Sequence, residues 1–271
     1  TNNRNASLNN SSEGTTYKEY TDQVNNIISK IKTDDIDKGV ISRYEHYLLD
    51  SKINLDQSLQ KISDENKNLL IYYFKINGNE FIGLSPEKLL ERNGMEISSS
   101  AVAGTNPINK ADNITDDDKI AIEHQIVVDY INSTLNKFSN ITYDKDPKIL
   151  ELNNLQHLIT PIRGILKNNF STLQILSSIH PTPAVCGSPY EESLSLINNL
   201  EMFDRGWFTG PIGWLNFNDN GLFFVAIRCL LKIDRNVYLF AGAGITGDSD
   251  SDSEWKETQT KISSILDYIK L

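Results

Sequence analysis

The chain has 271 residues, of which 39% are hydrophobic and 23% are charged, enough for a substantial core in one large domain or two small ones. Its net charge of −10 excludes a protein that binds nucleic acid or anionic lipid through a broad basic surface. The longest apolar run, residues 221–231, is far shorter than a bilayer span and contains Arg228. We therefore expect a soluble protein without a membrane or nucleic-acid partner.

Residues 1–15 are polar and lack the apolar block that is typical of a secretory signal. We expect a flexible N-terminal tail over 1–15 and a single domain over 16–271. Cys186 and Cys229 are far apart and form no CxxC pattern, which argues against a disulfide framework or a zinc site. Reduced thiols are typical of a cytoplasmic protein, and we expect a monomer or a weak homo-oligomer.

The first half of the domain is predicted to contain one helix followed by strands. In chain order, the apolar periodicity predicts a helix over 16–31, a strand over 37–43, hairpin strands over 69–76 and 80–84, and a strand over 95–102. Asn77-Gly78 is a typical hairpin turn. Ser85-Pro-Glu-Lys88 combines an N-cap residue, a proline and a glutamate in the order that predicts a short helix.

The second half is predicted to contain blocks of helix separated by strands. Helices are predicted over 116–137, 171–178, 191–200 and from 253 onward, and strands over 210–217, 221–231 and 237–243. Strands joined largely by hairpins, with helices inserted in blocks, predict an α+β fold with antiparallel sheets.

Three carboxylates have positions that bear on chemistry. Glu123 lies in the apolar stripe of the helix predicted over 116–137, where a carboxylate must be neutralised, paired with a cation or bound to a metal. Glu254 and Glu257 share one edge of the C-terminal helix with Lys261, a pattern that also fits a solvated edge with an i,i+4 ion pair. Glu123 and Glu257 together would suit Mg²⁺, whereas a structural salt bridge is the alternative for Glu123.

Other candidate residues also have ordinary structural explanations. Lys38 fits a lysine at the end of an edge strand, and Glu87 fits the first turn of the predicted short helix. His157 fits a hydrogen-bonded structural histidine. Arg228 interrupts an apolar strand, so we expect it to pair with a carboxylate or to bind an anionic ligand. The glycines among residues 242–244 would let a ligand lie against the backbone.

Several short segments follow one another in a fixed order between residues 35 and 261. They are Lys38-Gly-Val-Ile-Ser-Arg43, Leu84-Ser-Pro-Glu87, Ala103-Gly-Thr105, Glu123-His-Gln-Ile-Val-Val-Asp129, Gln156-His-Leu158, His180-Pro-Thr-Pro-Ala-Val-Cys-Gly187, Phe203-Asp-Arg-Gly206, Ala226-Ile-Arg228 and Ala241-Gly-Ala-Gly244. Together they closely resemble the chorismate-utilising enzymes, which include isochorismate, salicylate, anthranilate and aminodeoxychorismate synthases. The resemblance implies two large antiparallel sheets packed face to face with helices outside.

Within that family, the resemblance is strongest to isochorismate synthases. Lys38 resembles the lysine of members that add water, and Ala103 replaces the lysine of aminodeoxychorismate synthases. The segment that begins at His180 also resembles isochorismate synthases. We therefore expect Mg²⁺-dependent conversion of chorismate to isochorismate, by addition of water at C2 and loss of the C4 hydroxyl. Salicylate synthase and a non-catalytic chorismate-binding protein are the alternatives.

The resemblance also implies a role for each site residue. Lys38 would be the general base that activates water, which requires a neutral amine, and Glu87 would be the general acid. Glu123 and Glu257 would bind Mg²⁺ directly. Glu254 would contact one of these ligands, or would reach the ion through a water molecule. The residues implied to bind substrate are Gly104, Thr105, His157, Phe208, Arg228, Gly242, Ala243, Gly244 and Lys261.

The chain departs from the family pattern at two places. Relatives often have an Asp-Arg pair just before the Glu-His of the metal helix, where this chain has Lys119-Ile-Ala-Ile122. Many relatives also have a longer N-terminal segment, so we expect either a truncated form or a compact member. The resemblance leaves open whether the product serves menaquinone, siderophore or salicylate synthesis.

Overall fold

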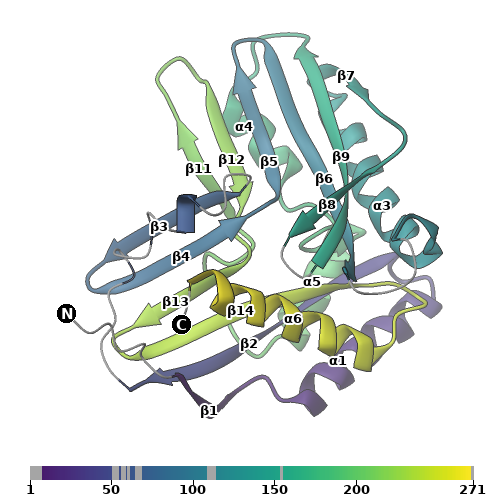
Figure 1. The fold of residues 1–271 in the computed structure, drawn as a ribbon. Helices are drawn as coiled ribbons and strands as arrows, with labels where there is room; N and C mark the ends of the chain where they lie inside the picture. Colours follow the sequence, from purple (N-terminus) through teal and green to yellow (C-terminus); the bar gives the residue numbers. More distant parts are fainter. Residues whose placement is uncertain are drawn as a thin grey trace.

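The strands form two antiparallel sheets (Figure 1). The structure is a computed structural model and describes residues 8–50, 55, 59, 62–64, 69–108, 114–152 and 155–269. Sheet A runs in the order β1 (Leu8–Gly14), β2 (Lys38–Leu49), β14 (Asn236–Ile245), β13 (Cys229–Ile233), β4 (Asn79–Ser85) and β3 (Leu70–Ile76), with β10 (Gly187–Ser188) beside β2. Sheet B runs in the order β11 (Pro211–Leu215), β12 (Gly221–Val225), β5 (Lys88–Asn93), β6 (Glu96–Pro107), β9 (Leu155–Leu166) and β7 (Ser139–Tyr143), with β8 (Lys148–Leu152) beside β9. The predicted α+β class is confirmed.

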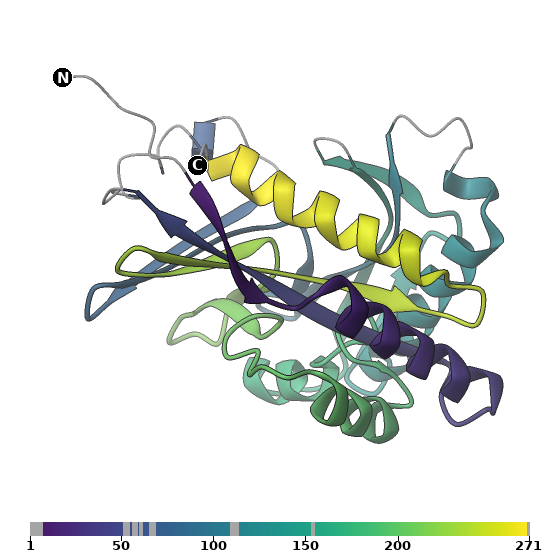
Figure 2. The same cartoon turned by 90° about the horizontal axis from the view of Figure 1, so that it is seen from below.

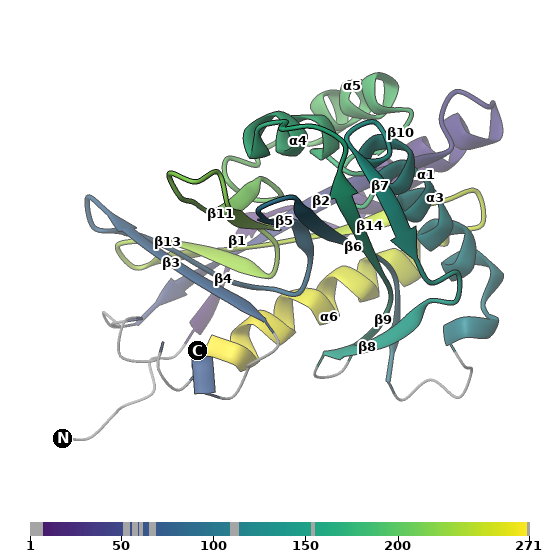
Figure 3. The same cartoon turned by 90° about the horizontal axis from the view of Figure 1, so that it is seen from above.

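Helices cover the outer faces of both sheets. The helices whose full extent is described are α1 (Tyr17–Lys32), α3 (Asp118–Leu135), α4 (Thr172–Ile179), α5 (Tyr190–Leu200) and α6 (Ser251–Ile269), with a 3₁₀ turn at Ile114–Asp116. Helix α6 packs along β14 of sheet A, and α3 packs on β6 of sheet B. Helices α4 and α5 lie on the side of the molecule away from α6 (Figures 2 and 3). No helix in the described part of the chain combines the length and apolar character needed to cross a bilayer.

The N-terminal helix begins as its sequence predicts. The Thr16 side chain accepts a hydrogen bond from the Glu19 amide, and the Glu19 carboxylate accepts one from the Thr16 amide. This capping box satisfies two amides at the start of α1 that have no partner within the helix. The apolar face of α1 then buries Tyr20, Val24 and Ile27 against sheet A.

The flexible tail expected over residues 1–15 contains a strand in the structure. Leu8–Gly14 form β1, which pairs antiparallel with β2 at the edge of sheet A. The segment is polar, and an edge strand can pair through backbone hydrogen bonds that its side-chain composition does not reveal. Residues 1–7 lie outside the described part of the chain.

Two short connections carry the chain directly from a strand of one sheet into a strand of the other, and both were predicted incorrectly. Residues 221–231 form β12 in sheet B and β13 in sheet A, with Arg228 between them at a φ of +52°. The segment from Ser85 to Glu87 forms no helix and leads from β4 directly into β5, where Pro86 lacks the amide that a sheet ladder needs. The two connections lie side by side, because the Val225 amide donates to the Glu87 carbonyl (3.0 Å) and the Leu84 amide to the Arg228 carbonyl (3.1 Å).

Candidate active site

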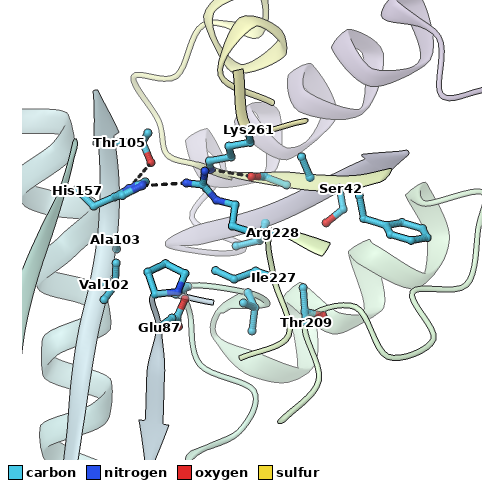
Figure 4. Close-up of a pocket in the computed structure, with 18 of the residues that line it drawn as sticks. Ser42, Glu87, Val102, Ala103, Thr105, His157, Thr209, Ile227, Arg228 and Lys261 are labelled. Carbon is cyan, nitrogen blue, oxygen red and sulfur yellow. Dashed lines mark hydrogen bonds between the residues drawn. The ribbon is translucent and has the colours of Figure 1, made fainter. Parts of the chain in front are cut away.

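A cavity opens where these two connections pass between the sheets (Figure 4). It is lined by side chains of both sheets and of α3 and α6. Ten of the predicted site residues line it, namely Glu87, Gly104, Thr105, Glu123, His157, Phe208, Arg228, Gly242, Gly244 and Lys261. The tertiary structure thus brings together residues that are more than 170 positions apart in the chain.

His157 and Arg228 form a hydrogen-bonded pair across the cavity (Figure 4). Arg228 Nη2 lies 2.9 Å from His157 Nε2, and because a guanidinium can only donate, Nε2 accepts. The imidazole Nδ1 therefore carries the hydrogen and lies 3.0 Å from Thr105 Oγ1. Burial lowers the pKa of His157 well below its ordinary value, and Arg228 and Lys261 lower it further. His157 is thus a neutral group that orients the arginine.

Lys261 supplies a second positive charge to the same cavity. Its Nζ donates to the Gly242 carbonyl oxygen at 2.9 Å (Figure 4). It also donates to Glu257 Oε1 at 2.6 Å. Arg228 also donates to Ser264 Oγ at 3.1 Å, which ties it to α6. Two oriented cations in a partly enclosed cavity suit a small ligand with carboxylate groups.

Glu87 is a buried carboxyl group in the wall of this cavity. Only 5% of the residue is exposed, and it lies on the connection between β4 and β5. Burial raises the pKa of Glu87 to about 8, although the ammonium groups of Lys38 and Lys261 act in the opposite direction. Glu87 is therefore protonated at neutral pH and able to donate a proton to a ligand.

Lys38 lies behind the cavity wall and does not line the cavity itself. Its side chain is fully buried, and its Nζ lies 3.1 Å from Glu123 Oε1. Lys38 Nζ has no hydrogen-bond partner with satisfactory geometry among the described residues. Burial by itself would raise the pKa of Glu123, but Lys38, Lys261 and Lys119 lower it below its ordinary value. Glu123 is thus an ionised carboxylate at the cavity edge.

We predict that Gly244→Ala disrupts this lysine–glutamate pair. A methyl group at Gly244 would overlap Glu123 Oε1 and Lys38 Cε, so both side chains would have to move. Overpacking of this kind costs about 1 to 3 kcal/mol, which chemical denaturation can measure. Gly247→Ala is the matched control, because its nearest neighbour would be Ile31 Cγ2 at an ordinary 3.6 Å. Equal stability of the two variants would contradict the prediction.

The carboxylates of α6 lie beside the cavity. Glu254 and Glu257 line an adjoining surface pocket with Lys119, and Thr105 borders both hollows. No group of three or more His, Cys, Asp or Glu side chains in the described ranges has the arrangement of a metal site. Glu123 and Glu257 nevertheless offer two oxygen donors from two helices, a ligand set that suits Mg²⁺ completed by water and substrate oxygens.

Ala243 is placed differently from the other predicted substrate-binding residues. Its side chain is 1% exposed and packs against Ile41, Ile245 and Tyr20 in the core under α1. Successive side chains of β14 point to opposite faces, so Gly242 and Gly244 border the cavity while Ala243 points away from it. The Ala243 side chain therefore does not reach the cavity.

Sequence reasoning assigned no role to Arg205 and Glu201, which tie the cavity walls together. Glu201 accepts hydrogen bonds from Arg205 Nε (2.8 Å) and from the Ser42 amide (2.8 Å). Arg205 Nη1 also donates to the Val185 carbonyl at 2.8 Å. Arg205 belongs to the segment Phe203-Asp-Arg-Gly206, so its place in a family motif was the signal that it contributes to the site.

Comparison with known proteins shows the family of the chain. A family model described as "Chorismate binding enzyme" matches residues 1–270. The chain belongs to this family of chorismate-binding enzymes. The segments that resembled the family therefore identified it correctly.

Curated relatives of the chain include isochorismate synthases. The chain is 35% identical over 247 residues to isochorismate synthase MenF of Bacillus subtilis, covering 88% of this chain and 52% of that protein. It is 32% identical over 252 residues to isochorismate synthase EntC of Escherichia coli K12, covering 88% and 64%. The chain thus spans about half to two thirds of the length of these relatives.

Solved structures show the same fold. The menaquinone-specific isochorismate synthase MenF from Escherichia coli matches with a TM-score of 0.84 at 26% identity, covering 99% of this chain and 65% of that one. Anthranilate synthase component I from Streptococcus pneumoniae matches with a TM-score of 0.83 at 22% identity, covering 96% and 59%. At 22% identity, the similarity to anthranilate synthase component I shows a shared fold only.

Proposed function

We propose that this chorismate-binding enzyme converts chorismate to isochorismate. The observation that carries the proposal is a buried, protonated Glu87 in the same cavity as Arg228 and Lys261, with Lys38 close enough to act on its pKa. A neutral carboxylic acid and two cations together suit a dicarboxylate substrate that must lose a hydroxyl group. The isochorismate synthases among the relatives support the choice of reaction.

In the proposed reaction, the chain's own residues bind the substrate and move two protons. Arg228 and Lys261 bind carboxylate groups and so orient the ring. The Lys38 ammonium must first lose its own proton, and the neutral amine then accepts a proton from the water that attacks C2. Glu87 donates a proton to the C4 hydroxyl, which leaves as water while the double bonds shift. One water enters and one leaves, so the product has the mass of the substrate.

Mg²⁺ is the proposed cofactor, and Glu123 and Glu257 are the residues that would hold it. When bound, the ion supplies positive charge that offsets the negative charge of the substrate carboxylate and of these two glutamates. Glu254 lies three residues before Glu257 on α6 and would act through Glu257 or through water. Glu123 lines the cavity, and Glu257 pairs with Lys261, which lines it too. This placement supports the assignment.

The proposal is tested by product analysis with chorismate and MgCl₂. Isochorismate of unchanged mass, without pyruvate, is the expected product. Salicylate with pyruvate would establish salicylate synthase instead, and anthranilate formed in the presence of ammonium would remove Lys38 from its proposed role. Chorismate binding in calorimetry without turnover would favour the non-catalytic alternative.

We predict that turnover falls as the pH rises through about 8. Glu87 must be protonated to donate its proton, and its pKa is raised to about 8 by burial. The active fraction of Glu87 is therefore near its maximum below that pH and declines above it. A profile of kcat against pH at saturating chorismate measures this alkaline limb. A constant kcat between about pH 7 and 9.5 would contradict the assignment of Glu87 as the acid.

A further inference from the structure

Lys119 pairs with Glu254 and lies close enough to Glu123 and Glu257, the two proposed metal ligands, for their charges to act on it. It is on α3, four residues before Glu123, and its Nζ pairs with Glu254 Oε1 of α6 at 2.5 Å. Burial lowers the pKa of Lys119, but Glu254, Glu257 and Glu123 together raise it above its ordinary value. Lys119 therefore carries a full positive charge at neutral pH and is attracted to all three carboxylates.

Three lysines pair with the three carboxylates, and they differ in their access to solvent. The Lys38 side chain is 0% exposed, that of Lys261 is 15% exposed, and that of Lys119 is 27% exposed. Lys119 lines the surface pocket beside the cavity, whereas its partner Glu254 is only 2% exposed. Lys119 can thus withdraw toward solvent while Glu254 stays in place.

We infer that Lys119 is an internal cation that competes with Mg²⁺ for the carboxylates of the site and thereby lowers the affinity of the site for the metal. A dication held by Glu123 and Glu257 would be repelled by the nearby ammonium of Lys119, so binding is weakened unless Lys119 moves away toward solvent and gives up its ion pair with Glu254. The inference rests on the proposed function, because the magnesium site is part of that proposal. It adds a residue of this chain that opposes metal binding.

The test compares Mg²⁺ binding by the wild-type chain and by Lys119→Met without chorismate. Methionine keeps much of the side-chain volume and removes the charge. Calorimetric titration with MgCl₂ alone should give a dissociation constant about tenfold lower or more for Lys119→Met, equivalent to about 1.4 kcal/mol. Lys119→Arg retains the charge and should keep the wild-type affinity.

Lys256→Met is the matched control for loss of a positive charge. Lys256 lies on α6, is exposed and lines the same surface pocket, but it forms no ion pair with Glu254 or Glu257 among the described residues. Its substitution should leave the dissociation constant unchanged. Thermal unfolding provides a second readout, because Mg²⁺ should raise the Tm of Lys119→Met more than that of the wild-type chain.

An unchanged or weaker affinity of Lys119→Met would overturn the inference, and weaker binding would show that Lys119 instead positions Glu254 for the metal. Failure of both chains to bind millimolar MgCl₂ would also overturn it. Product analysis separates this result from the proposed reaction. Tighter Mg²⁺ binding by Lys119→Met, in a chain that makes no isochorismate, would support the inference and reject the reaction. Formation of isochorismate with unchanged Mg²⁺ affinity would support the reaction and reject the inference.

Discussion

Lys38→Gln is expected to reduce turnover of chorismate by about 10²- to 10⁴-fold, the usual loss when a general base is removed. The side chain of Lys38 is fully buried beside Glu123, so no other described lysine has the same position. Binding should be affected much less than turnover, because Arg228 and Lys261 remain in the cavity. Steady-state kinetics with chorismate would therefore show a large fall in kcat and a small change in KM.

Lys232→Gln is the matched control for loss of a buried lysine. Lys232 pairs with Glu80 at 2.6 Å in sheet A, and its side chain is 7% exposed, but it does not line the cavity. Both variants leave a buried glutamate without one of its cations and should unfold at lower temperature. Turnover by the folded Lys232→Gln chain should stay near the wild-type value. Near-normal turnover of Lys38→Gln would contradict the assignment of the base.

Glu87→Gln is expected to reduce turnover by about 10²- to 10⁴-fold and, at the same time, to stabilise the fold. Glutamine has the size of glutamate and keeps hydrogen-bonding groups, but it cannot supply the proton that the leaving hydroxyl needs. The loss should appear in kcat, since Arg228 and Lys261 still bind the substrate. Turnover within about tenfold of the wild-type value would remove Glu87 from this role.

The predicted gain in stability follows from the raised pKa of Glu87. Burial raises this pKa from 4.5 to about 8, so between these values the folded chain keeps a proton that the unfolded chain releases. The contribution of Glu87 to stability is therefore fully present below pH 4.5 and is lost as the pH rises through about 8.

Glutamine does not titrate, so the advantage of Glu87→Gln should grow over the same pH range. Each unit of pKa difference corresponds to about 1.4 kcal/mol, which makes the advantage on the order of a few kcal/mol at pH 7. Denaturant unfolding at a series of pH values measures it. Glu80→Gln is the control, and it should lower the free energy of unfolding, because it leaves the buried Lys232 without its carboxylate partner.

Much of the candidate site was predictable because several of its residues belong to the short motifs that resemble the family. Glu87, Glu123 and Arg228 each lie in a segment that resembles the family, and all three line one cavity. Their roles remain predictions. The helices α1, α3 and α6 were also predictable, since each has a long apolar periodicity that depends only on neighbouring residues.

The errors occurred where local sequence has no information about the partner strand. Residues 221–231 are apolar throughout, so their periodicity does not show that the chain leaves sheet B after Val225 and enters sheet A at Cys229. Ser85-Pro-Glu-Lys88 has the local features of a helix start, yet pairing of β5 with β12 and β6 holds Lys88 in a strand. Strand pairing across the sheet outweighed the local preference in both places.

The sequence by itself determined the family, the fold class and about half of the residues that border the cavity, because these depend on the order of motifs and on local periodicity. Only the tertiary structure decided the charge state and the partners of those residues. Burial keeps Glu87 protonated, and the packing of α3 against α6 pairs Lys119 with Glu254, 135 positions further along the chain. Burial and long-range electrostatic contacts are properties of the folded chain, since both require groups distant in sequence to exclude water from one place.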